Sequence, residues 1–264
     1  MNAVVALLLA ALLGGLAGSG TAEKAIEKGL RDTFHPQQVQ VNLRRGHRSP
    51  FSRTMDRLEI NLAGFRSQGD SGGLSLQGGH ALMAAKVGRV VIKAADFEVG
   101  GLPVKEMELT LADLRYDLWR ALWNRKLRLL GFDPKESELV LTFTAQGLQR
   151  FLAPRVTALQ HLAITLHDGR VEVAGRAQAS WLRIPVRLSG RLEPQGGAIY
   201  LRDPTLAVSM VPIPGFLTER ILAQINPLVN LNQEVKGPLR LQMRFVLVRA
   251  TGLTLRAGIS PTKS

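Results

Sequence analysis

Apolar and polar residues alternate one by one in segment after segment of this 264-residue chain. Such a period of two is typical of a strand with one buried face. Leu162 to Gly175 contains two such runs joined by Asp168-Gly169, which predicts a β-hairpin with a two-residue turn. With few helical patterns between them, these segments predict an α+β fold with a mostly antiparallel sheet. The alternating segments are 39–43, 58–63, 106–111, 137–144, 162–175, 181–192 and 238–248.

Helical patterns are fewer. Residues 21–36 place Ile26, Leu30 and Phe34 four apart, which predicts an amphipathic helix of about three turns that ends at His35-Pro36. Residues 145–156 predict a second helix, capped by Thr144. A third is predicted over 215–231, where Leu217, Ile221, Ile225 and Leu228 form one stripe, widened by Leu222 and Val229. Residues 118–127 are compatible with either a helix or a loop.

The N-terminus carries an uncharged apolar run from Ala3 to Ala17, which resembles the hydrophobic region of a signal peptide. As a helix it would span roughly 22 Å, less than the ~30 Å of a bilayer core. We therefore expect residues 1–22 to be a signal peptide or an N-terminal membrane anchor. The expected organisation is then a single domain over 23–258, with a short C-terminal tail over 259–264.

The chain has a net charge of +13 and only 5% aromatic residues. Such an excess of positive charge suits an anionic partner, either a membrane surface or a nucleic acid. Scarce aromatic residues argue against stacking on nucleobases. The basic stretch 44–57 contains Arg44, Arg45, Arg48 and Arg53, which we expect to bind lipid headgroups or an anionic membrane, although an exposed basic hairpin loop would look the same.

Patterns that carry catalytic chemistry are few. GDSGG at 69–73 matches the string around the nucleophile of chymotrypsin-like proteases, but the chain lacks cysteine and a suitable upstream His context, so an ordinary loop explains it better. None of the five histidines is spaced for a metal site. We expect no enzymatic activity, no catalytic residues, no metal and no cofactor other than a possible bound phospholipid.

Residues 203–217, DPTLAVSMVPIPGFL, form an apolar turn stiffened by Pro212 and Pro214 where a polar linker would be usual. Proline has no backbone N–H, so none is left unpaired beside an acyl chain. A lipid slot and a plain hydrophobic core both account for this turn. If it is core, Val211, Ile213, Phe216 and Leu217 simply close the end of the fold.

Residues 201–231, LRDPTLAVSMVPIPGFLTERILAQINPLVNL, resemble the C-terminal signature of the LmeA-like phospholipid-binding family. The shared features are Asp-Pro-x-Leu-x-Val, a Pro-rich apolar turn, a helix ending in Ile-Asn-Pro and a Leu-rich tail. Asn230 departs from the Asp that the family tends to have there. The looser resemblance extends over roughly residues 22–258.

The resemblance implies a long curved sheet wrapped around a few helices, with an elongated apolar groove that binds lipid. It also implies an exported, extracytoplasmic, periplasmic and membrane-associated protein of the bacterial cell envelope that binds or transfers phospholipid. By this resemblance the candidate lipid contacts are Val211, Pro212, Ile213, Pro214, Phe216, Leu217, Ile221, Leu222 and Ile225. A nucleic-acid or other polyanion binder, and a structural envelope protein that docks a partner, remain as alternatives.

Overall fold

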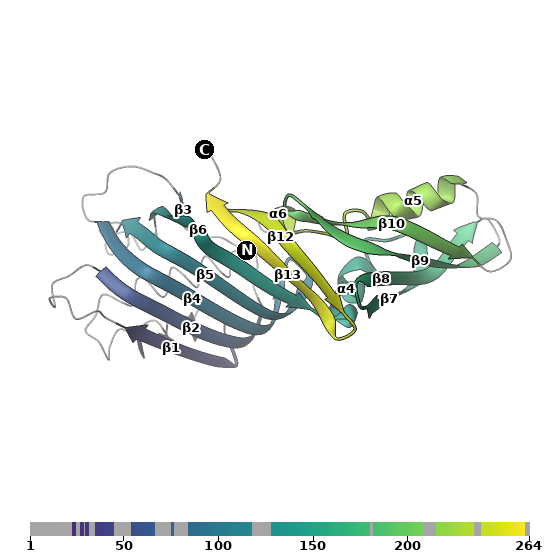
Figure 1. Ribbon diagram of the computed structural model, residues 1–264. Coiled ribbons are helices and arrows are strands. Elements are labelled where there is room, and N and C mark those ends of the chain that lie inside the picture. The colour runs from purple at the N-terminus through teal and green to yellow at the C-terminus, as the bar shows by residue number, and fades with distance from the viewer. Residues whose placement is uncertain are drawn as a thin grey trace.

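The computed structural model describes residues 23–24, 27–28, 30–31, 35–44, 54–66, 75–76, 84–117, 128–179, 182–208, 215–234 and 239–261. They form two sheets that lie toward opposite ends of an elongated molecule (Figure 1). The large sheet has the order β1-β2-β4-β5-β6-β13-β12, with β3 paired beside β6, and the small sheet has the order β11-β10-β9-β8-β7. The predictions within residues 67–74, 77–83 and 118–127 lie outside the described residues.

The strands of the large sheet are β1 (Gln38–Arg44), β2 (Thr54–Arg66), β3 (Ser75–Leu76), β4 (Ala84–Val99), β5 (Leu102–Asp117), β6 (Arg128–Phe143), β12 (Leu239–Arg249) and β13 (Gly252–Pro261). Those of the small sheet are β7 (Leu159–His167), β8 (Arg170–Ala179), β9 (Leu182–Gln195), β10 (Ala198–Val208) and β11 (Val229–Asn230).

Most pairs of neighbouring strands are antiparallel, as the alternating pattern predicts; the described exceptions are β2 with β4 and β3 with β6. The predicted hairpin is confirmed as β7 and β8, and Gly169 in its turn has a φ of 76° that glycine adopts without strain. The large sheet is also curved, as the family resemblance implies (Figure 1). The predicted wrapping of this sheet around helices, and an elongated groove, stay predictions.

The bending of the large sheet has a local cause in its backbone. Gly64 in β2 and Asp96 in β4 both have positive φ, 64° and 51°, at the same level of the sheet. The pairing of the two strands keeps its register across this level, so both strands bend together. Beyond it, buried alternation resumes one residue later, and the stacked rings of Phe65 and Phe97 lie 5.0 Å apart on the inner face. Aspartate tolerates this conformation better than a β-branched residue does.

The N-terminal segment lies on the free edge of β1. The described residues between 23 and 31 are helical, and Leu30 is fully buried in the core. The N–H groups of Leu43 and Val41 donate to the carboxylates of Glu23 (2.8 Å) and Glu27 (3.3 Å). The two carboxylates thereby accept hydrogen bonds from backbone N–H groups that an edge strand would otherwise leave without a partner in the sheet. The predicted amphipathic helix is confirmed for these residues, while Ile26 and Phe34 lie outside them.

The helix predicted at 145–156 is confirmed as α4 (Ala145–Leu152). The Thr144 hydroxyl accepts from the Gly147 N–H at 3.0 Å, which is the predicted cap. The helix ends earlier than expected because Pro154 has no N–H to donate to a carbonyl one turn back, although Ala153 itself is still helical (φ −52°, ψ −45°). Its buried side chains, among them Leu148 and Phe151, belong to the core.

The single helix predicted over 215–231 is wrong beyond Ile225. The structure has α5 (Gly215–Ile225), then the short strand β11, then α6 (Leu231–Glu234). Pro227 cannot donate a backbone hydrogen bond, so the helix stops before it. Val229 instead pairs with Ile199 in β10. The last members of the apolar stripe, Leu228 and Val229, therefore lie in a bend and in β11 rather than in a helix.

Tyr116 in β5 is completely buried, and its hydroxyl has no hydrogen-bond partner among the described residues. Burial raises the pKa of this phenol from 10.0 to about 12. The neutral phenol therefore contributes stability below pH 10, where the unfolded chain is also neutral, and this contribution is lost as the pH rises from 10 to 12.

The free energy of unfolding of the native protein should therefore fall between pH 9 and pH 11.5. We expect this fall to be about 2 kcal/mol smaller in Tyr116→Phe. At pH 8 the substitution should not lower stability, because it removes a buried hydroxyl that makes no described hydrogen bond and is costly to keep from water. Urea unfolding at a series of pH values measures both effects. Tyr200→Phe, at a less buried position, is the control; equal pH dependence in the two variants would contradict this account.

Candidate functional site

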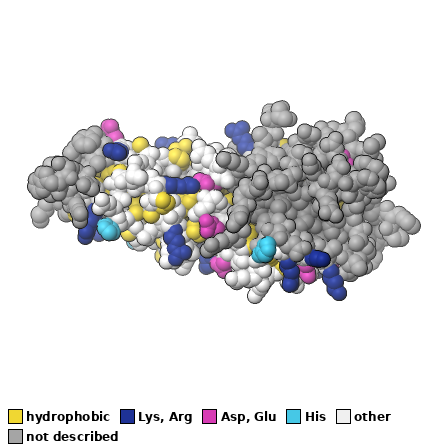
Figure 2. Space-filling view, turned by 180° about the vertical axis from the view of Figure 1, so that it is seen from behind, with side chains coloured by type: hydrophobic (Ala, Val, Ile, Leu, Met, Phe, Trp, Pro, Cys, Tyr) yellow, Lys and Arg dark blue, Asp and Glu magenta, His cyan; other side chains and the backbone are white. Residues whose placement is uncertain are grey.

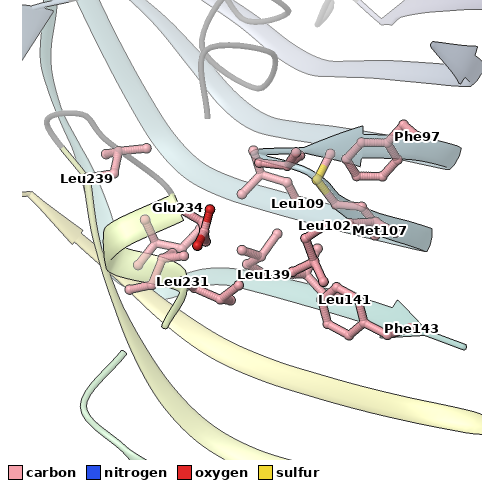
Figure 3. A pocket seen from close by; sticks show the side chains of 14 residues that line it. Phe97, Leu102, Met107, Leu109, Leu139, Leu141, Phe143, Leu231, Glu234 and Leu239 are labelled. Atoms are coloured by element: carbon pink, nitrogen blue, oxygen red, sulfur yellow. The ribbon is translucent and has the colours of Figure 1, made fainter. Parts of the chain in front are cut away.

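An apolar cleft lies between α6 and the inner face of the large sheet (Figure 3). The empty space between its walls is about 600 Å³, part of which is open solvent. The centre of a water molecule would have access to only about 50 Å³ of it. The cleft is thus narrow. Its walls are the side chains of Phe97, Val99, Leu102, Val104, Met107, Leu109, Leu139, Leu141, Phe143, Leu231, Glu234, Leu239, Leu241 and Ile259.

Strand alternation explains why these walls are apolar. In β5, Leu102 and Val104 precede the bend of the sheet, and Met107 and Leu109 follow it with the alternation shifted by one residue. The bend therefore keeps all four side chains on the inner face. Because neighbouring strands present their apolar faces at the same level, the wall is continuous from β4 to β12.

α6 is held over the cleft by a paired hydrogen bond. The Asn232 side chain accepts from the N–H of Leu241 (2.9 Å) and donates to the carbonyl of the same residue (3.0 Å). It thus substitutes for a neighbouring strand at the edge of β12. The N–H of Leu231 also donates to the Gly197 carbonyl at 2.9 Å. Any side chain on Gly197 would collide with Asn232, so this close approach requires glycine.

One charged side chain lies among the apolar walls. The carboxylate of Glu234, at the end of α6, forms an ion pair with Arg155 at 2.7 Å. The guanidinium of Arg155 also lies 3.6 Å from the centre of the Phe151 ring, in cation–π geometry. The Glu234 side chain is 17% exposed and that of Arg155 is 45% exposed. The pair therefore connects the apolar interior of the cleft with solvent.

The turn between β4 and β5 closes against the same carboxylate. A Cβ built on Gly100 would come within 2.6 Å of the second carboxylate oxygen of Glu234. Gly100 also has a φ of 58°, which favours glycine. Glu234 is thus enclosed by a backbone turn on one side and a guanidinium on the other, and it needs that guanidinium because a half-buried carboxylate is costly when unpaired.

The residues predicted from the sequence to contact lipid lie elsewhere. Ile221 and Ile225 in α5 are buried in the core, and Leu222 is half-buried against it. Phe216 and Leu217 belong to α5, but their side chains lie outside the described residues, as do Val211, Pro212, Ile213 and Pro214. The structure therefore brings none of the described candidates to the α6 cleft, and their contact with lipid stays a prediction.

Of the predicted basic residues, only Arg44 is described, exposed at the end of β1. Arg45, Arg48 and Arg53 lie outside the described residues. The described residues thus do not test whether these four arginines cluster, and headgroup binding by them also stays a prediction.

The α6 cleft was not predicted from the sequence. The alternation of Met107, Leu109, Leu239 and Leu241 was recognised as a buried face, but nothing local in the sequence shows what covers that face. Asn232 and Glu234 do not stand out in the sequence, because residues 230–236 are mostly polar.

Within the described ranges there is no group of three or more His, Asp or Glu side chains placed to hold a metal ion. No described helix is both long enough and apolar enough to cross a membrane.

The protein is therefore of the β-rich class, with an apolar cleft between a curved, mostly antiparallel sheet and the short helix α6. A search of curated proteins finds no match. The model of the LmeA-like phospholipid-binding family matches residues 75–258, more than two thirds of the chain. The chain therefore belongs to this family, as the signature at 201–231 predicts, and membership points to lipid binding.

Proposed function

We propose that this protein binds a phospholipid without chemically altering it, with an acyl chain in the α6 cleft and the headgroup at Arg155 and Glu234. The observation that carries the proposal is the lining of the cleft, where every wall residue but Glu234 is apolar. Transfer of hydrocarbon from water into such a site is favourable by roughly 0.8 kcal/mol per CH₂. A narrow cleft with flexible walls such as Met107 suits a flexible chain better than a rigid ring.

The cleft can be obstructed at Val99, whose half-buried side chain lines it near the end of β4. We expect Val99→Trp to lower binding of a fluorescent phosphatidylcholine at least several-fold, because the larger ring occupies space that an acyl chain would fill. Val140→Trp is the matched control, since Val140 is also half-buried but lies in β6 outside this cleft.

Lipid extraction and mass spectrometry of the purified full-length chain provide the second measurement. Native protein should carry phospholipid, and Val99→Trp should carry less of it than Val140→Trp. Full occupancy in both variants, or a native protein without extractable lipid, would contradict acyl binding in the α6 cleft.

Arg155 retains further N–H donors besides the one directed at Glu234. We propose that it donates to the headgroup phosphate, because a phosphate at the mouth of the cleft would be within reach of this half-exposed guanidinium. Arg155 and Glu234 should be changed together, so that no half-buried carboxylate is left unpaired.

We expect the Arg155→Gln/Glu234→Gln double variant to bind phospholipid about tenfold more weakly or worse, as for loss of one charge-assisted hydrogen bond. Its affinity for diacylglycerol with the same acyl chains should be unchanged, because diacylglycerol has no phosphate. Competition against the fluorescent lipid compares the two ligands. Equal losses for both would show that the pair supports the cleft rather than the headgroup.

We further propose that the protein acts at the extracytoplasmic face of a membrane, in maintenance of the cell envelope. The apolar N-terminal run and the family membership support this location. Residues 1–25 fused to a phosphatase that is active only outside the cytoplasm should give active enzyme. An inactive fusion of normal abundance would contradict export.

A further inference from the structure

The outer face of β12 and β13 combines exposed arginines with an exposed aromatic ring. Phe245 in β12 is 52% exposed and is the one large apolar side chain with such exposure among the described residues. Arg240, Arg244 and Arg249 are exposed on the same strand, and Arg256 lies opposite Phe245 in β13. We call these five residues the β12–β13 surface.

A shift in register explains why a phenylalanine is exposed there. Leu239, Leu241 and Met243 alternate inward, and the pairing with β13 then shifts between Met243 and Phe245. The extra residue turns both Arg244 and Phe245 outward, and Val248 returns to the core. The exposed ring thus results from a defined irregularity of the strand.

Charge on this surface is largely uncompensated. Among the described residues, Arg256 pairs with Glu138 at 3.1 Å, whereas Arg240, Arg244 and Arg249 make no ion pair. Arg244 lies flat across the sheet, because a Cβ on Gly258 would be 2.7 Å from its guanidinium. In the view of Figure 2, the visible basic and acidic side chains of the described residues lie interspersed.

We propose that the β12–β13 surface docks the protein on an anionic lipid bilayer, with Phe245 inserted at the interface and the arginines on headgroup phosphates. Phe245 supplies apolar contact, and arginines near an anionic membrane surface are attracted to it. Leu239, Leu241 and Ile259 of these two strands line the α6 cleft from the inner face, so docking would place the cleft one sheet thickness from the bilayer. The proposal rests on the proposed membrane location but not on lipid binding in the cleft.

The absence of cysteine from the chain permits a direct test. Full-length Phe245→Cys, labelled with an environment-sensitive fluorophore, is mixed with vesicles of phosphatidylcholine alone or with 30% phosphatidylglycerol. The label should shift to the blue with anionic vesicles and much less with neutral ones. Ala163→Cys, exposed in β7 of the small sheet, is the control and should not respond. Because the label reports its own surroundings, anchoring by the N-terminal segment cannot imitate this result.

The contribution of the arginines is tested in the labelled Phe245→Cys background. Arg240→Gln/Arg244→Gln should lower the ratio of docked to undocked label by roughly fivefold per arginine. The control pair Arg176→Gln/Arg191→Gln removes the same charge from exposed positions of the small sheet and should have a small effect. Equal effects of the two pairs would assign binding to overall charge and overturn the proposal.

Two other results would overturn it: a label at position 245 that does not respond to anionic vesicles, or one that responds to duplex DNA instead. The phospholipid content of the same variants is measured by extraction. Failure of docking with normal lipid content would reject the β12–β13 surface alone, whereas absence of lipid with normal docking would reject the function proposed for the cleft.

Discussion

Two asparagine side chains form hydrogen bonds with backbone groups at the open edges of the two sheets. The arrangement of the candidate site depends on these hydrogen bonds. Asn226 accepts from the N–H of Leu201 at 2.7 Å and donates to its carbonyl at 3.1 Å. Asn232 does the same for Leu241. Backbone groups at a sheet edge need partners when they are covered, and an amide side chain offers one donor and one acceptor, as a strand does. The segment after α5 can therefore lie along both edges without being a strand throughout.

This pairing links the two sheets. Asn226 holds the end of α5 to the small sheet, β11 continues that sheet, and Asn232 holds α6 to the large one. The turn between β9 and β10 also contributes, because the Met243 N–H donates to Gly196 at 2.6 Å. As a result α6 covers an apolar face that would otherwise be open to water. The cleft exists because a four-residue helix covers only part of that face.

The β12 strand has different roles on its two faces. Leu239 and Leu241 on its inner face line the cleft, whereas arginines and Phe245 lie on its outer face. This division follows from the period of two, interrupted by one shift in register. One strand thus joins an apolar interior to a charged exterior.

Much of the fold is predictable from the sequence because its determinants are local. Alternating residues identify the strands, Asp168-Gly169 identifies a hairpin, and Thr144 identifies a helix start. The signature at 201–231 identifies the family. The end of α5 was missed although Pro227 marks it, because the apolar stripe continues past the proline with helical spacing. The bend at Asp96 was missed because aspartate is equally common in ordinary turns.

The sequence by itself determined which faces of the strands are apolar, since that depends only on the order of residues along each strand. Tertiary structure alone decided what covers each face. Glu234 and Arg155 are 79 residues apart, and Asn232 in α6 contacts Gly197 in the turn between β9 and β10. Such contacts arise where the chain returns to a sheet edge, and no local pattern specifies that return. The candidate cleft lies under α6 because contacts of this kind hold α6 there. The sequence alone pointed instead to the apolar turn before α5.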